Sequence, residues 1–177
     1  SSGKYVASPT ADRGESGCTT AFKGSVEYQV EVPKAGDYFL WVRFSSQNTG
    51  QNSWYLQVDE PKSALGNVDL VWDTCVPEFM PQKLGEAVGP LEEPGPAWEF
   101  KPGWDWMRLV ERIDGQFNVL TIRVLKLSAG KHTLYLWNRE SWTKADVFFL
   151  ADTFKQQPVL PSESPGWSVD NLGKVTT

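Results

Sequence analysis

Short runs of alternating apolar and polar residues, separated by turn residues, constrain the fold of this chain most strongly. In residues 26–32, valine and tyrosine alternate with glutamate and glutamine, which is the two-residue period of a strand with one buried face. Residues 38–45 carry aromatic rings on both faces, so we expect a central strand that is covered on both sides. Because turn residues occupy 33–37, we predict that the two strands form a hairpin.

The same pattern continues along the chain. Further strands are expected at 54–59, 67–72, 106–112, 117–127, 132–139 and 145–154. The turn at 128–131 predicts a second hairpin, between 117–127 and 132–139. No window shows a helical stripe with caps. About nine strands with turn-rich connections predict an all-β protein, an antiparallel β-sandwich or jelly roll.

The length of 177 residues is suited to one domain. We expect residues 1–155 to form the sandwich and the proline-rich residues 156–177 to be a linker or a tail packed on its surface. Residues 77–103 contain six prolines and are therefore expected to be a long loop. Loops of this length in a compact domain are usually functional.

Charge and cysteine content exclude some classes of partner. The net charge of −5 argues against a nucleic acid or an anionic membrane, because both attract a basic surface. No apolar run is long enough to span a bilayer. Residues 1–4 do not look like a signal segment, so any secretion signal has been removed or was never included. Cys18 and Cys75 form either one disulfide or two buried thiols.

The chain has nine tryptophans, and eight of them fall into groups by their surroundings. Those within alternating strands are expected to be framework residues: Trp41, Trp54 and Trp137. Two more are expected to face the core: Trp72 and Trp106. Three lie in loops rich in proline, glycine and charge: Trp98, Trp104 and Trp142. An indole in a loop either stacks on the C–H face of a sugar ring or pins its loop onto the sandwich.

Polar residues in two loops suit the hydroxyl groups of a sugar. Asn138, Arg139 and Lys144 surround the last loop, where the two cations either bind an acidic sugar or pair with Glu140 and Asp146. The amides of Gln51 and Asn52 either bind hydroxyls or belong to an ordinary hairpin tip. Arg43 either reaches the same edge or pairs with an acid on a neighbouring strand.

Catalysis finds little support in the sequence. The single histidine, His132, follows a turn and has no partnered nucleophile motif. No phosphate loop, metal-binding histidine set or nucleophile elbow is present. We therefore expect a protein that is not an enzyme. Two alternatives stay open: a cell-surface adhesion or protein-interaction domain with a broad apolar patch, and a glycan-active enzyme that uses two carboxylates.

Several segments, in this order and spacing, resemble a known family. They are residues 24–28, 32–43, 52–59, 127–134, 138–140 and 145–150. Over roughly residues 3–154 the chain resembles β-jelly-roll carbohydrate-binding modules grouped around families 6 and 35, which are galactose-binding-domain-like. The resemblance implies a non-catalytic, secreted or cell-surface module that binds a polysaccharide or oligosaccharide. It also implies a monomer within a larger protein, often beside a glycoside hydrolase or a polysaccharide lyase.

The resemblance further implies where ligands bind. The usual sugar site lies in the loops at one edge of the sandwich, and a second site is found on a sheet face in some members. Many members also hold a structural calcium ion, and Asp146 matches one of its ligands. This chain departs from the family at its start, because residues 3–6 come after the acidic first strand that supplies the other ligands. Calcium at Asp146 is therefore an expectation with half of its cage missing.

Overall fold

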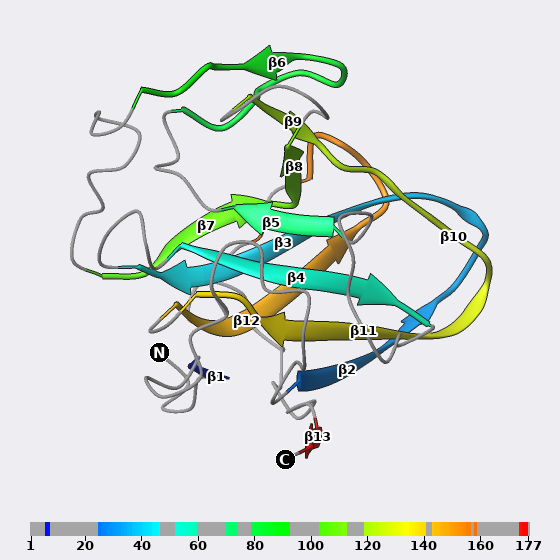
Figure 1. Cartoon of the computed structure of the whole chain (residues 1–177). Helices are drawn as coiled ribbons and strands as arrows, with labels where there is room; N and C mark the ends of the chain where they lie inside the picture. The colour runs from blue at the N-terminus through cyan, green and yellow to red at the C-terminus, as the bar shows by residue number, and fades with distance from the viewer. Residues whose placement is uncertain are drawn as a thin grey trace.

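The computed structural model describes residues 6–7, 25–46, 52–59, 70–73, 79–92, 103–112, 119–140, 143–156, 158 and 174–176. These residues form an all-β antiparallel sandwich, which confirms the predicted fold class (Figure 1). Within the described residues there is no α-helix, and hence none long and apolar enough to span a membrane.

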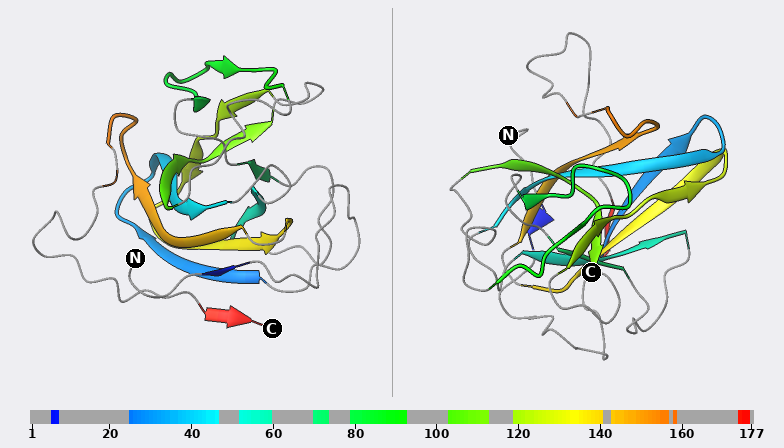
Figure 2. Two further views of the ribbon diagram at one scale, coloured as in Figure 1. Left: turned by 90° about the vertical axis from the view of Figure 1, so that its left-hand side faces the viewer. Right: turned by 90° about the horizontal axis from the view of Figure 1, so that it is seen from above.

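The sandwich consists of two five-stranded sheets and a smaller third sheet. The first sheet contains β1 (Val6–Ala7), β12 (Lys144–Ala151), β3 (Gly36–Ser45), β10 (Leu125–Leu127) and β7 (Asp105–Arg108). The second contains β13 (Lys174–Thr176), β2 (Ser25–Val32), β11 (Gly130–Asn138), β4 (Ser53–Val58) and β5 (Leu70–Asp73). The third contains β6 (Ala87–Val88), β9 (Leu120–Ile122) and β8 (Val110–Arg112). In Figure 1 and in the left view of Figure 2 this small sheet lies at the top, farthest from β2 and β13.

Strand β3 is the central strand that its sequence predicts. It pairs with β12 along one edge, and with β10 and then β7 along the other. Its residues from Tyr38 to Phe44 are all buried, because both faces are covered. Phe148 of β12 pairs with Val42 and contacts Tyr28 of β2 at 4.3 Å between ring centroids, so the Val42 face is the interior of the sandwich.

Both predicted hairpins are wrong. Strand β2 pairs with β11 and β13, whereas β3 belongs to the other sheet, so the turn at 33–35 carries the chain across the sandwich. The turn between β10 and β11 makes the reverse crossing next to it, since Leu127 pairs with Gly36 and Gly130 pairs with Val32. Turn residues have the same chemistry at a hairpin and at a corner between sheets, and only the pairing of the strands distinguishes them.

Two segments expected to be single strands each divide between sheets. Residues 106–112 form β7 and β8, with a break at Leu109. The Leu109 N–H donates to the Leu40 carbonyl (2.7 Å), and the Leu109 carbonyl accepts from the Arg123 N–H (3.0 Å). The described part of the second segment, residues 119–127, divides in the same way into β9 and β10. These breaks create the third sheet from strands that leave the first. They also raise the number of strands above the nine expected, together with the short β1, β6 and β13.

The core contains two of the tryptophans assigned to the scaffold and one that was expected to face inward. Trp41 and Trp54 are buried, and Trp72 is fully buried. The Trp72 ring lies edge-on to Trp54 at 6.1 Å, and its Nε1 donates to the Arg108 carbonyl at 3.2 Å. The expected long loop at 77–103 also contributes to the core, because Met80 and Leu91 are buried and β6 pairs with β9.

Candidate functional site

Several strand ends meet at one end of the sandwich, on the left in Figure 1. Strands β3 and β11 end there, and β4, β7 and β12 begin there. We call this end the rim. It brings together predicted site residues from distant parts of the sequence: Arg43, Asn52, Trp104, Asn138, Arg139, Lys144 and Asp146. The predicted site residues Gln51, Trp98 and Trp142, and the cysteines Cys18 and Cys75, lie outside the described residues.

A β-bulge positions the first ion pair of the rim. Ala145 pairs with Phe44 and Val147 pairs with Arg43, so Asp146 is the extra residue between them. Bulges of this kind redirect a side chain. The Asp146 carboxylate accepts from both arms of Arg43, with 2.8 Å from Nε to Oδ1 and a second bond from Nη2 to Oδ2. The two side chains are 9% and 0% exposed.

The ion pair and its burial shift the pKa values of Arg43 and of the nearby Tyr28. The hydrogen bond to Asp146 raises the pKa of the Arg43 guanidinium above its ordinary value, although burial opposes the shift. Burial, and then the negative charge of Asp146, raise the pKa of the Tyr28 hydroxyl. Arg43 therefore pairs with an acid on a neighbouring strand, one of the two alternatives that its sequence position allowed.

The arrangement does not fit a calcium ion. Both oxygens of Asp146 bind a guanidinium, which a cation would have to displace. Among the described residues, no group of three or more histidine, cysteine, aspartate or glutamate side chains is placed to hold a metal. Structural calcium stays a prediction that the described residues do not support.

Trp104 is held at the rim by this ion pair. Its side chain is half-buried, and the Arg43 Cζ lies 5.5 Å from the centroid of its ring, within the range of a cation–π contact. Gly103, just before it, has a φ of 131°, which favours glycine where the chain enters β7. Asp146 thus orients Arg43, and Arg43 supports one side of the indole.

A second ion pair, between Arg139 and Glu140, joins the ends of β4 and β11 in the second sheet. The Arg139 Nη1 donates to Glu140 Oε1 at 2.8 Å and to the Ser53 hydroxyl. The second oxygen of Glu140 accepts from the Asn52 backbone N–H at 2.9 Å. Arg139 and Asn52 are only 4% and 2% exposed, so both are internal braces of the rim. Lys144 is half-exposed, and the Asn138 side chain lies outside the described part.

The outer face of the first sheet carries a group that the sequence analysis missed. Arg108 pairs across from Trp41, and Trp106 pairs across from Arg43, so the four side chains share one face. The Cζ of the buried Arg108 lies 4.5 Å from the centroid of the Trp41 ring and 4.1 Å from the centroid of the Phe154 ring. Burial lowers its pKa. The available signal was the alternation of residues 106 and 108, which places an arginine beside a tryptophan on the same face.

This face has hydrogen-bond donors that lack acceptors among the described residues. The Nε and Nη1 of Arg108 and the Nε1 atoms of Trp41 and Trp106 have no hydrogen-bond partner there, while the Arg108 Nη2 donates to the Phe154 carbonyl at 3.0 Å. Trp106 is half-buried and packs against the core cluster, so the expectation that it faces the core is only partly met.

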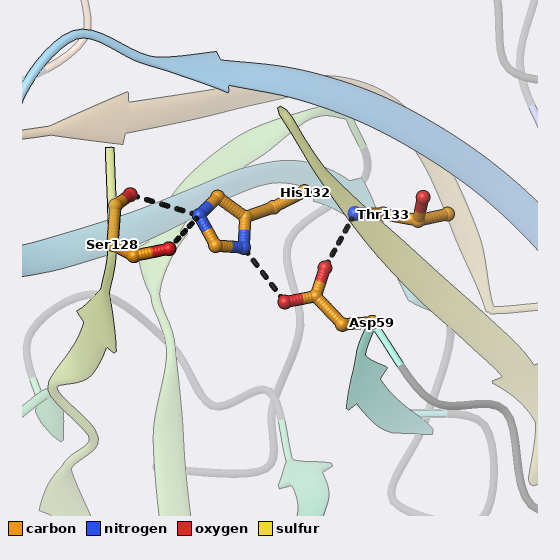
Figure 3. Close-up of polar contacts among 4 residues, drawn as sticks. All are labelled: Asp59, Ser128, His132 and Thr133. Atoms are coloured by element: carbon orange, nitrogen blue, oxygen red, sulfur yellow. Dashed lines mark hydrogen bonds and ion pairs between the residues drawn. The ribbon is translucent and has the colours of Figure 1, made fainter. Parts of the chain in front are cut away.

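His132 has partners that its sequence position did not suggest (Figure 3). Its Nδ1 lies 2.7 Å from Asp59 Oδ2, and its Nε2 lies 2.9 Å from the Ser128 carbonyl and 3.4 Å from the Ser128 hydroxyl. A carbonyl can only accept, so Nε2 carries a proton and has no lone pair for the serine. The geometry is therefore that of a cationic brace and not of a catalytic triad. The bond to Asp59 is the main cause of the raised pKa of His132.

Comparison with known proteins adds little. No protein-family model matches the chain, and no curated protein matches it. Among solved structures, it is similar to a Paenibacillus sp. cycloisomaltooligosaccharide glucanotransferase complexed with cycloisomaltoheptaose, with a TM-score of 0.35 and 16% identity. The match covers 82% of this chain and 18% of that one. At this TM-score the likeness carries no argument about family or function.

Proposed function

We propose that this sandwich is a non-catalytic carbohydrate-binding module and that its rim binds a polysaccharide or oligosaccharide. The observation that carries the proposal is the half-buried indole of Trp104 at the rim, supported from one side by Arg43. A pyranose ring presents a flat C–H face to such an indole and directs its hydroxyls toward polar groups around it. The rim has this combination of an aromatic surface and polar strand ends.

The rigidity of the rim also supports the proposal. Arg43 is fixed by the two hydrogen bonds that it donates to Asp146, and the ends of β4 and β11 are joined through Ser53, Arg139 and Glu140. A binding surface that is already ordered loses less conformational entropy when a ligand binds. Such preorganisation matters for sugars, because their individual contacts are weak.

The alternative of an adhesion domain receives no such support. It predicts a broad apolar patch on the surface. Among the described residues, Leu84 is the large hydrophobic side chain that is exposed, at 53%. A single leucine in a turn is ordinary for a protein surface.

The experiment is affinity electrophoresis followed by calorimetry over a broad panel of neutral and acidic polysaccharides. For a ligand that binds, Trp104→Ala is expected to weaken affinity by about 1–2 kcal/mol, or roughly 5- to 30-fold, through the loss of stacking area. Tyr135→Ala is the matched control, because this half-exposed aromatic lies in the middle of β11, away from the rim. The same test applies to Trp98→Ala and Trp142→Ala, whose roles stay predictions.

Two results would contradict the proposal. One is the absence of binding across the whole panel by a correctly folded protein. The other is binding that Trp104→Ala and Tyr135→Ala weaken equally, since this would place the ligand away from the rim or reflect a general loss of structure.

A further inference from the structure

Each arginine at the rim is already paired with its own carboxylate. Arg43 uses two nitrogens on the two oxygens of Asp146, and both side chains are almost fully buried. The side chains of Arg139 and Glu140 are 5% and 14% exposed. The two positive charges of these pairs are therefore matched by two negative charges.

Other groups of the second pair are engaged too, and the Arg139 Nε, which has no hydrogen-bond partner among the described residues, is buried. The Ser53 hydroxyl accepts from the Arg139 Nη1, and the Asn52 N–H donates to the oxygen of Glu140 that faces away from Arg139. A ligand carboxylate that approached the Arg139 Nη1 would have to displace one of these groups, and burial keeps it from Nε. It would also meet the negative charge of Glu140, which lies 2.8 Å from the guanidinium.

Among the described residues at the end of β3, the half-buried charges balance as well. Asp105 of β7 pairs across from Phe44, and Lys144 of β12 pairs across from Ser45, so one charge of each sign flanks the end of β3. Both residues have interaction partners of their own. The chain as a whole carries a net charge of −5, which adds a long-range repulsion toward polyanions.

Displacing a buried pair is unfavourable. An anionic sugar that binds Arg43 would leave the Asp146 carboxylate buried without its partner, and an uncompensated buried charge costs more than one charge-assisted hydrogen bond returns. A neutral sugar has no such requirement, because it stacks on Trp104 while both ion pairs stay intact.

We infer that the rim is selective for uncharged saccharides and discriminates against uronic acids and sulfated sugars. This inference rests on the proposed function, and it departs from the expectation that Arg139 and Lys144 would recruit an acidic sugar. The ion pairs serve to shape the rim and to hold the indole, while the ligand is recognised by stacking and by neutral hydrogen bonds.

The experiment compares each neutral polysaccharide that binds with the same polymer oxidised at C6 to the uronic acid. We expect the oxidised form to bind at least about tenfold more weakly. We also expect the affinity for the neutral form to change less than about twofold between about 20 and 500 mM NaCl, because no ligand charge is being screened.

A pair of variants tests the cause. Glu140→Gln keeps the shape of the side chain and removes its charge, so the oxidised polymer should gain at least about fivefold in affinity relative to the wild type. Glu111→Gln is the matched control, since Glu111 forms an ion pair with Arg123 in the third sheet, away from the rim. It should leave both affinities unchanged. The affinities of the neutral and the oxidised polymer are also compared on the wild-type protein alone, so the inference can be tested even if a variant is unstable.

The outcomes separate the inference from the proposed function. If the oxidised polymers bind more tightly than the neutral ones, with an affinity that falls steeply with salt, the protein binds carbohydrate but the inference is wrong. If no polymer of either kind binds, the proposed function itself fails, and the inference fails with it.

Discussion

His132 is expected to stabilise the fold as a cation, and Asp59→Asn tests this. The imidazole bridges two segments at the end of the sandwich opposite the rim: Asp59, which follows β4, and Ser128, in the turn before β11 (Figure 3). Both ring nitrogens face acceptors, an arrangement that is complete only when both are protonated. Asp59 itself has a φ of 65°, a conformation that asparagine adopts readily, so the substitution leaves the backbone unstrained.

The magnitude follows from the contacts that change. The amide oxygen introduced by Asp59→Asn would still accept from the Thr133 N–H, which lies 2.9 Å from Asp59 Oδ1, but the charge-assisted bond of 2.7 Å to His132 would become neutral. A hydrogen bond to a charged group contributes about 1.5–3 kcal/mol and a neutral one about 0.5–1.5 kcal/mol. The Asp59 side chain is 45% exposed, and this solvent screening reduces the difference to about 1 kcal/mol. For a chain of this size that corresponds to a Tm lower by roughly 2–4 °C.

The sign of the pH dependence is set by the direction of the shift. The pKa of His132 is raised in the folded state, so the folded state binds the proton more tightly than the unfolded state. The stabilisation is fully present below the unfolded pKa of about 6.5 and is lost as the pH rises through the higher folded pKa. The Tm difference between the wild type and Asp59→Asn should therefore be largest near pH 5.5 and shrink toward pH 9.

The assay is calorimetric unfolding of both proteins across this pH range. Glu31→Gln is the control, because this exposed carboxylate pairs across from Lys131, next to His132, without contacting the imidazole. It should show no comparable pH-dependent difference. A constant Tm gap between wild type and Asp59→Asn at all pH values would refute the reasoning, since it would show that the contribution of Asp59 does not depend on the protonation of His132.

Three further predictions concern stability and can be measured by chemical denaturation. Asp146→Ala leaves the buried Arg43 guanidinium without its carboxylate and should cost about 3–5 kcal/mol; a loss below about 1 kcal/mol would show that the pair is solvated. Trp72→Ala removes a fully buried indole and should also cost about 3–5 kcal/mol, unless neighbouring side chains collapse into the space. Gly130→Ala meets no atom within 4 Å, so its expected cost of about 1 kcal/mol or more comes from the φ of 122°, and an unchanged midpoint would contradict that origin.

Local sequence patterns were sufficient to locate strands and to assign burial along them. The alternation in 26–32 and the two apolar faces of 38–45 correspond to β2 and to the buried β3. These predictions succeed because a two-residue period is a property of each strand by itself. The assignment of Trp41 and Trp54 to the scaffold was right for the same reason, whereas the roles of Trp98 and Trp142 stay untested.

Strand partners could not be predicted in this way. Both expected hairpins proved to be crossings between sheets, because a turn does not reveal which strand its neighbour will pair with. The division of residues 106–112 at Leu109 depends on hydrogen bonds with Leu40 and Arg123, which are remote in the sequence. Such breaks have no local signal.

For the candidate site, the sequence by itself determined which residue types were available and that they lie near strand ends. Only the tertiary structure decided what each of them does. Arg43 and Asp146 are 103 residues apart, and they meet because a bulge in β12 turns the carboxylate toward β3. Because both side chains are buried, neither charge can be left unpaired without a large cost in stability. Arg43, which could have bound an acidic ligand, therefore supports Trp104 instead. The charge of a side chain follows from its residue type, but the partner that neutralises it depends on the tertiary structure.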